Sequence, residues 1–231
     1  MGEGSAAVAR FGPFGLTGTV LTTSALVLLL ALCAALATRR LRVEEPGLLQ
    51  TALEGSVLAI RGAIEAVLPG EGDRLLPFVG TLWLFIGAAN LAGVVPGVHS
   101  PTGDLSATTA LALLVFLSVH WFGIRQEGVR AYLRHYLSPS PILLPFHLIS
   151  EITRTVALAM RLFGNMMSLE MAALLVLLVA GFLVPVPVLM LHIVEAVVQA
   201  YIFGMLALVY IGGGLQVRNP GAQAPQGGNA K

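Results

Sequence analysis

The sequence predicts an all-α membrane protein with five transmembrane helices and one further helix that lies on the membrane surface. Of the 231 residues, 56% are hydrophobic and only 11% are charged, whereas soluble domains carry about 25% charged residues. The apolar residues gather into stretches of the roughly 20 residues that cross a hydrocarbon core about 30 Å thick. Lys231 is the only lysine, and no basic tract indicates binding of nucleic acid.

The first expected transmembrane helix covers residues 16–37. Three arginines follow it, Arg39, Arg40 and Arg42, and because arginine is retained on the cytoplasmic side, the N-terminus is expected outside. A secretory signal peptide carries its charge in front of the apolar stretch, so this segment is interpreted as a retained helix. Cys33, the single cysteine, lies inside it and can form neither an intrachain disulfide nor a cysteine cluster for a metal.

The next segment, residues 46–76, mixes apolar and charged side chains. It is too polar to cross the membrane, and its apolar residues recur with the period of a helix, which a linker would not show. We therefore expect an amphipathic helix that lies along the cytoplasmic surface of the membrane, with its apolar side in the lipid.

Two shorter transmembrane helices are expected at residues 78–95 and 107–124. The turn between them, residues 97–104, contains glycine, proline and serine but no arginine or lysine, and is therefore assigned to the outside. The connection that follows the second helix, residues 125–141, is assigned to the cytoplasm because it carries three arginines. These are Arg125, Arg130 and Arg134.

The last two apolar stretches, residues 143–184 and 188–214, are separated by only three residues that include two prolines. They predict a long helical hairpin. At 1.5 Å per residue the first stretch would measure about 60 Å, so it must tilt, bend or begin outside the hydrocarbon core. The polar tail, residues 215–231, is expected in the cytoplasm, and the whole chain, residues 1–231, is interpreted as a single membrane domain.

Ionisable side chains inside a transmembrane helix are costly, and they indicate an ion or proton path by default. The helix 143–184 carries five such groups and an asparagine: His147, Glu151, Arg154, Arg161, Asn165 and Glu170. At about 100° per residue, the first five lie within an arc of about 80°. Glu170 lies on a different face and roughly 13 Å further along the axis than Arg161. Arg161 is therefore predicted to stand between polar surfaces that face different ways.

The last helix carries a second polar stripe, formed by His192, Glu195 and Gln199 within about 60° of one another. The two stripes are expected to face each other. Glu170 and His192 lie toward the outer turn of the hairpin and could line a passage from outside. His147, Glu151 and Arg154 lie toward the cytoplasm, where Arg154 could also extend to the membrane interface or pair with Glu151.

A structural interpretation remains open for part of this set, because polar side chains also join transmembrane helices by hydrogen bonds. Asn165 and Gln199 fit either role, and so does Glu195. Arg161 fits the structural role poorly, because arginine stays charged and needs a partner or water inside the membrane. His99 and His120 lie at or near the ends of expected helices and are left out of the site.

Several motifs resemble the subunit a family of F-type ATP synthases. The segment Arg161–Met166 (RLFGNM), followed by Glu170, resembles the family signature, and residues 192–203 (HIVEAVVQAYIF) resemble its last helix. Residues 90–96 (NLAGVVP) and 101–104 (PTGD) resemble an earlier helix and an external turn of the family. The resemblance extends over most of the chain from Phe78 onward.

The resemblance implies a stator in the inner membrane with two offset half-channels that load and unload the carboxylates of a rotating c-subunit ring. Arg161 would stand between the half-channels and prevent a direct leak. The further partners implied are b-type peripheral stalk subunits, the catalytic head and rotor, and the lipid bilayer. The chain has no GxxxxGK[ST] phosphate loop, so nucleotide chemistry is expected in partner subunits, and no metal or cofactor is expected here. The ion is left open between proton and sodium.

Two other classes of protein were weighed. A secondary transporter or antiporter also places charges inside the membrane, but it is expected to show repeated halves or broken helices, which the sequence does not indicate. A structural membrane scaffold would leave the two aligned polar stripes without a purpose. The stator interpretation therefore accounts for more of the sequence.

Overall fold

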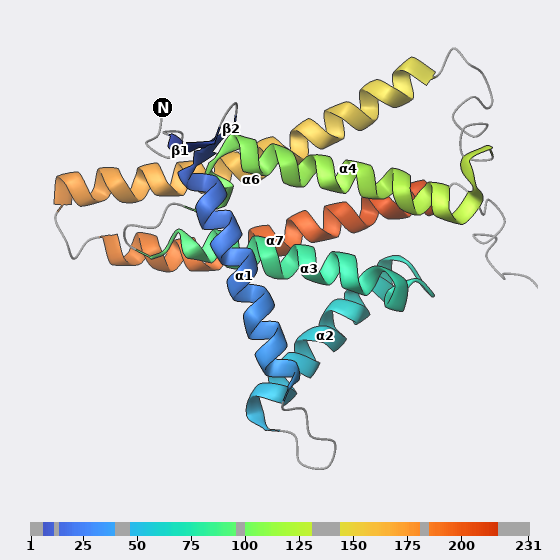
Figure 1. Cartoon of the computed structure of the whole chain (residues 1–231), viewed down its shortest axis with the longest axis horizontal. Helices are drawn as coiled ribbons and strands as arrows, with labels where there is room; N and C mark the ends of the chain where they lie inside the picture. Colours follow the sequence, from blue (N-terminus) through green and yellow to red (C-terminus); the bar gives the residue numbers. More distant parts are fainter. Residues whose placement is uncertain are drawn as a thin grey trace, which may run out of the picture.

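The computed structural model describes residues 7–11, 14–39, 47–95, 100–130, 144–180 and 185–216. Helices dominate the described part, so the predicted fold class is confirmed. The sequence did not predict the short antiparallel pair at the start, β1 (Ala7–Phe11) and β2 (Phe14–Thr17). Figure 1 shows this pair beside the beginning of α1.

Five helices in the described residues are long and apolar enough to cross a membrane. This number agrees with the five transmembrane helices that the sequence predicts, and their bounds differ from the predicted ones by a few residues. They are α1 (Gly18–Thr38), α3 (Gly72–Ala92), α4 (Leu105–Glu127), α6 (Leu144–Ala180) and α7 (Pro185–Gln216).

The surface segment predicted at residues 46–76 is shorter in the structure, where α2 covers Leu48–Val67. A turn ends it, because Gly70 adopts a φ of 83° that glycine tolerates best. The carboxylate of Glu65 holds this turn by accepting hydrogen bonds from Gly70 N at 2.7 Å and Gly72 N at 3.1 Å. The remaining residues of the predicted segment belong to α3, which begins at Gly72.

The hairpin of the last two helices is the longest feature of the chain. Figure 1 shows α6 changing direction along its 37 residues, so the bend that the sequence allowed is observed. The prolines expected to separate the two helices lie in the first turn of α7, where a missing backbone N–H costs little. The predicted end of the first helix, residues 181–184, lies outside the described residues.

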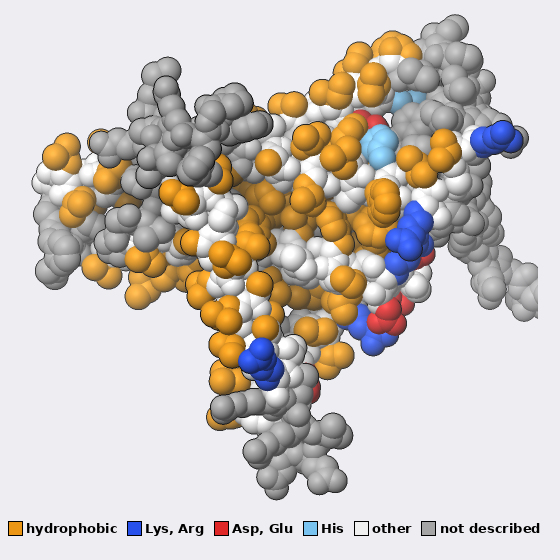
Figure 2. Space-filling model, viewed as in Figure 1, with side chains coloured by type: hydrophobic (Ala, Val, Ile, Leu, Met, Phe, Trp, Pro, Cys, Tyr) orange, Lys and Arg blue, Asp and Glu red, His pale blue; other side chains and the backbone are white. Residues whose placement is uncertain are grey.

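The core lies between α3, α4, α6 and α7. Leu82 and Ile86 of α3 pack there with Leu162 of α6 and Phe203 of α7, all of them buried. Close approach of α3 and α7 depends on Gly204, because a Cβ at this position would overlap the indole of Trp83. Most other apolar side chains are exposed, and Figure 2 shows them covering the visible face of the bundle, as expected for a surface in contact with lipid.

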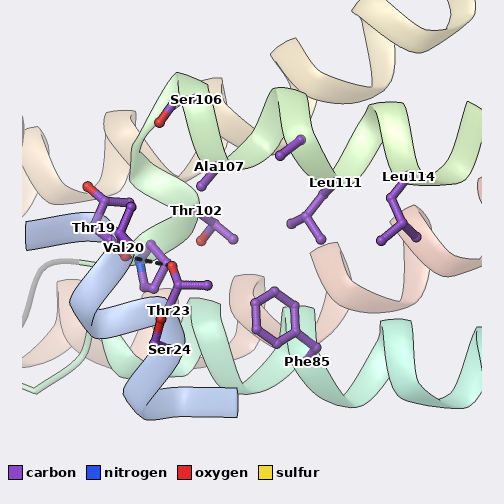
Figure 3. A pocket seen from close by; sticks show the side chains of 12 residues that line it. Thr19, Val20, Thr23, Ser24, Phe85, Thr102, Ser106, Ala107, Leu111 and Leu114 are labelled. Atoms are coloured by element: carbon purple, nitrogen blue, oxygen red, sulfur yellow. Dashed lines mark hydrogen bonds between the residues drawn. The ribbon is translucent and has the colours of Figure 1, made fainter. Parts of the chain in front are cut away.

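Helix α1 stands apart from this core and has no buried residue. Its N-terminal end is tied to α4 by a hydrogen bond from Thr19 Oγ1 to Asp104 Oδ2 at 2.7 Å. A largely apolar cavity of about 340 Å³ lies between α1, α3, α4 and the short 3₁₀ helix η2 (Pro101–Gly103). Figure 3 shows Phe85 and Leu111 on its walls. The ionisable side chains of α6 and α7 do not line this cavity.

Candidate ion-translocation site

The polar stripes of α6 and α7 meet where Asn165 contacts Gln199. Asn165 Nδ2 donates a hydrogen bond to Gln199 Oε1 at 2.8 Å, so the two stripes face each other as the sequence predicts. Gln199 is 2% exposed, and its Nε2 has no hydrogen-bond partner among the described residues. A buried amide donor therefore remains unused at the contact between the two helices.

Arg161 lies one helical turn from this contact, about 6 Å along α6 toward Leu144. Its neighbour Leu162 is fully buried, whereas Arg161 itself is exposed. Within the described part of the chain, the structure gives its guanidinium no hydrogen bond or ion pair. An arginine inside a transmembrane helix needs a partner or water, so this one must obtain them from outside the described residues.

Glu170 points toward the α3–α4 connection and away from the Asn165–Gln199 contact. Its Oε1 accepts a hydrogen bond from Ser100 N at 3.2 Å. Both carboxylate oxygens lie against Gly103, where an added Cβ would come within 3.2 Å of each. Glu170 and Arg161 are thus on different surfaces of α6, as the helical geometry predicts.

Half-buried Glu170 belongs to a polar cluster whose other members are buried, and we call it the η2 cluster: Asn90, Ser100, Thr102, Glu170 and His192. Thr102 Oγ1 donates to Asn90 Oδ1 at 2.6 Å, and Ser100 Oγ lies 2.7 Å from Thr102 Oγ1. His192 Nε2 lies 3.3 Å from the Asn90 carbonyl, and Asn90 Nδ2 donates to the Ala196 carbonyl at 3.4 Å. Asn90, Thr102 and His192 are at most 2% exposed.

His192 and Glu170 of this cluster are among the site residues predicted from the sequence, whereas Ser100 and Thr102 are not. Asn90 and Thr102 were noted only within motifs that resemble the family. A polar residue in a turn is ordinarily exposed, so composition alone gave no signal that these hydroxyls are buried. The signal that existed was the place of Asn90 and Thr102 in those motifs; Ser100 lies in neither.

Glu195 is half-buried and lies one turn before Gln199 on α7. Because α6 and α7 run antiparallel, this places Glu195 on the Glu170 side of the Asn165–Gln199 contact, while Arg161 lies on the opposite side. Of the described residues, none forms an ion pair or hydrogen bond with Glu195 that the structure shows.

At the other end of α6, Glu151 faces α4. Glu151 Oε2 lies 3.4 Å from His120 Nε2, and we call these two residues the His120 pair. His120 was left out of the predicted site because it lies near the end of an expected helix, and the structure places it beside Glu151. His120 nevertheless falls inside the predicted span 107–124, and the rule that an ionisable group in a span indicates function would have included it.

The other two residues predicted at this end are exposed. Arg154 extends toward α7, and its guanidinium carbon lies 5.8 Å from the centre of the Tyr210 ring, a cation–π arrangement. The structure thus shows Arg154 on Tyr210, while the contact it gives Glu151 is with His120. His147 lies one turn before Glu151. Among the described residues, no group of three His, Cys, Asp or Glu side chains could hold a metal ion.

These features define a class of protein: a multi-pass helical membrane protein with ionisable and amide side chains inside its last two helices. Two polar regions, the η2 cluster and the His120 pair, lie at opposite ends of α6, and Arg161 and the Asn165–Gln199 contact lie between them.

Comparison with known proteins then gives the family. The model of the ATP synthase A chain matches residues 19–212. The chain is 67% identical over 214 residues to ATP synthase subunit a 2 of Pelobacter propionicus, covering 93% of each protein. It is 62% identical over 207 residues to ATP synthase subunit a 1 of Hahella chejuensis (90% of this chain, 88% of the relative). It is 45% identical over 222 residues to ATP synthase subunit a of Nitrosospira multiformis (95% and 88%). The chain belongs to the ATP synthase A chain family.

Proposed function

We propose that this chain is the ion-translocating stator subunit a of an F-type ATP synthase. It forms two offset access paths, one from each side of the membrane, that load and unload carboxylates on a rotating ring of c subunits. Family membership supports the assignment. The observation that carries the mechanism is the exposed Arg161 beside the buried Asn165–Gln199 contact, with a polar region on either side.

The outer path runs along the η2 cluster. Glu170 and His192 are its ionisable groups, and the amide and hydroxyl groups of Asn90, Ser100 and Thr102 surround them. Glu195 continues this path along α7 toward the Asn165–Gln199 contact. The free Nε2 of buried Gln199 can donate to a carboxylate or a water molecule that arrives from outside the chain.

The inner path starts at the opposite end of α6. His147, Glu151 and Arg154 follow the same stripe as Arg161 and lead toward it from the cytoplasmic side. Because the side chains of Arg154 and Arg161 are exposed on the bundle, this path is open on one side. The c-subunit ring is the partner that would complete it.

Arg161 separates the two paths by its charge. Arginine is protonated at any accessible pH, so it favours the deprotonated carboxylate of a passing c subunit and repels a cation that moves directly between the paths. An ion must therefore travel around the ring to cross. A monovalent ion yields about 2.3 kcal/mol per 100 mV of membrane potential, so several ions must be coupled to each ATP.

The finer assignments of partners and orientation follow from the family and from the distribution of arginine. The partners are the c-subunit ring, b-type peripheral stalk subunits, the lipid bilayer and, indirectly, the catalytic head and rotor. The chain resides in the bacterial plasma membrane with its N-terminus outside and its C-terminus in the cytoplasm. α2 lies on the cytoplasmic surface, where Leu48 and Leu49 of its apolar side, both more than 80% exposed in the isolated chain, enter the lipid.

Replacing Arg161 with alanine in the complete synthase tests the proposal. ATP synthesis driven by an imposed ion gradient in vesicles is expected to fall to background. Arg61→Ala is the matched control, because Arg61 is an exposed arginine of α2 that pairs with Asp73 at 3.0 Å, and such surface pairs contribute little. Gradient-driven synthesis that persists in Arg161→Ala would show that the chain does not act in this way.

A further inference from the structure

The His120 pair joins α4 to α6 at the end of the bundle opposite the η2 cluster. Its two side chains are 27% and 22% exposed, so each is largely enclosed between the helices, and Glu151 Oε2 itself is buried. The 3.4 Å separation is longer than a well-formed charge-assisted hydrogen bond. The contact is therefore a close approach of imidazole and carboxylate across the helix interface, which is an ion pair only when the ring is protonated.

The second nitrogen of the His120 ring determines where the proton lies. His120 Nδ1 is 2.9 Å from the carbonyl oxygen of Phe116. A carbonyl oxygen only accepts hydrogen bonds, so Nδ1 is the protonated nitrogen and the neutral ring would present a lone pair at Nε2. The ring also packs against the Phe116 ring in a tilted arrangement, with centroids 4.4 Å apart. Both contacts hold Nε2 toward Glu151.

A lone pair on Nε2 and an ionised Glu151 oxygen would repel each other at this distance. The contact is favourable when the pair holds one proton in addition to the one on Nδ1. This proton is either on Nε2 with Glu151 ionised, or on Glu151 with the ring neutral. Carrying that single proton, the pair has no net charge. Losing it leaves one negative charge, and gaining a second leaves one positive charge.

We propose that His120 and Glu151 share one proton, that His120 positions Glu151 at the inner path, and that the charge there therefore follows cytoplasmic pH. The inference rests on the proposed function, which places this end of α6 on the cytoplasmic side. Histidine changes charge between about pH 5 and 8, within the range a cell can experience. A positive pair at low pH disfavours a cation in the inner path, and a neutral or negative pair favours it.

The other ionisable groups at this end are distributed over the helices that pack around the pair. On α6, His147 lies one turn away and is exposed, and Arg154 lies on the Tyr210 ring of α7. On α4, Arg125 is exposed beyond the pair, and Arg130 follows it after α4. The arginines keep their charge over this range. His147 is the one further histidine at this end among the described residues, so a variant of it is tested alongside.

The experiment measures ATP hydrolysis by the complete synthase in inverted membrane vesicles, with the ion gradient dissipated and the medium varied from acidic to alkaline pH. The medium then sets the pH at the cytoplasmic face. Dividing each variant's rate by the wild-type rate at the same pH cancels the pH dependence of the catalytic head. His120→Gln and His120→Arg both keep a donor for Glu151 but cannot titrate in this range.

For both variants, the ratio of the hydrolysis rate to the wild-type rate is expected to rise by roughly threefold to tenfold as the medium becomes acidic. This is the effect of one charge near a partly solvated path. For Glu151→Gln, the ratio of the hydrolysis rate to the wild-type rate is also expected to depend on pH. Arg125→Gln, which removes a charge at the same end without touching the pair, is expected to give a ratio that does not depend on pH. His147→Gln is expected to give a smaller pH-dependent change than the His120 variants, because His147 is exposed.

If the rate ratio does not depend on pH for either His120→Gln or His120→Arg, the proposal that His120 and Glu151 share a proton is overturned. An equal response in Arg125→Gln or His147→Gln would also overturn it, because the effect would then come from the general charge of this end. The Arg161→Ala result separates the two proposals. If gradient-driven synthesis survives in Arg161→Ala, the proposed function fails; if it is lost while the His120 variants follow wild type, only the present inference fails.

Discussion

The two ends of α6 are built differently. At the η2 cluster, three side chains are at most 2% exposed and are connected by short hydrogen bonds to α3, η2 and α7. From the middle of α6 to its other end, Arg161 and Arg154 are exposed, Arg154 lies on the Tyr210 ring of α7, and Glu151 approaches His120 of α4 at 3.4 Å. The chain therefore completes one polar region by itself and leaves the other open.

This difference teaches which surfaces need a partner. A buried polar group without a hydrogen bond costs about 1–3 kcal/mol, so the η2 cluster must keep its internal contacts in any state of the protein. The exposed arginines carry no such requirement within the chain. A charge inside the membrane needs water or an opposite charge, which, under the proposed function, a c-subunit carboxylate would supply as it passes Arg161. Under the proposed function, we expect the closed end to act as a fixed passage and the open end to form half of an interface.

The largest effect on stability is expected at the closed end. Asn90→Leu removes the acceptor of Thr102 Oγ1 and the donor to the Ala196 carbonyl, both buried. Each group left unpaired costs about 1–3 kcal/mol. Thermal denaturation of the protein in detergent is expected to show a clear fall in melting temperature.

The matched change at the open end is His147→Leu, because His147 is exposed on α6. Surface substitutions of this kind stay within about 0.5 kcal/mol. If both leucine variants melt at the same temperature, the contrast between a closed and an open end is wrong.

A smaller loss of stability is expected where the two regions meet, and its size is expected to differ between substitutions of Asn165 and of Gln199. Asn165→Leu leaves the amide of Gln199, which is 2% exposed, without its partner. Gln199→Leu instead replaces the buried amide by an apolar side chain of similar size, and leaves half-buried Asn165 able to reach water. Asn165→Leu is expected to be less stable than Gln199→Leu by about 1 kcal/mol.

Denaturation of the two single variants and the double variant measures this asymmetry. The double variant, which removes both amides, is expected to be closer in stability to Gln199→Leu than to Asn165→Leu. Equal losses in both single variants would indicate that water reaches Gln199 and that the boundary between the two regions is not dry.

The sequence could predict the helices and their polar stripes because both depend on local patterns. Long apolar stretches and the 3.6-residue period are sufficient to place Arg161, Asn165, Glu170 and His192. Contacts between distant helices are not encoded locally. No periodic pattern in the sequence predicts that His120 approaches Glu151 or that Thr102 is buried against Asn90. The end of α2 was misplaced for a related reason, since Gly70 and the Glu65 carboxylate create the turn together.

The smallest effect is expected at Asp104, at the edge of the closed end, where α1 is attached. Burial raises the pKa of this carboxyl, but hydrogen bonds from Thr19 Oγ1 and from the backbone and side chain of Ser106 outweigh it, so its pKa lies below the usual value. A lowered pKa means that the folded state favours the ionised form. The resulting stabilisation is present above the unfolded pKa and is lost as pH falls through the folded pKa.

Thr19→Val removes one of these hydrogen bonds without changing the shape of the side chain much. Its melting temperature is expected to lie slightly below that of wild type at neutral pH, and the gap is expected to close as the pH falls below the usual range for aspartate. Thr23→Val is the control, because Thr23 Oγ1 bonds to the Thr19 carbonyl within α1 and leaves Asp104 untouched. A gap that stays constant in acid would mean that Thr19 acts through packing, and that α1 is held to the closed end by shape alone.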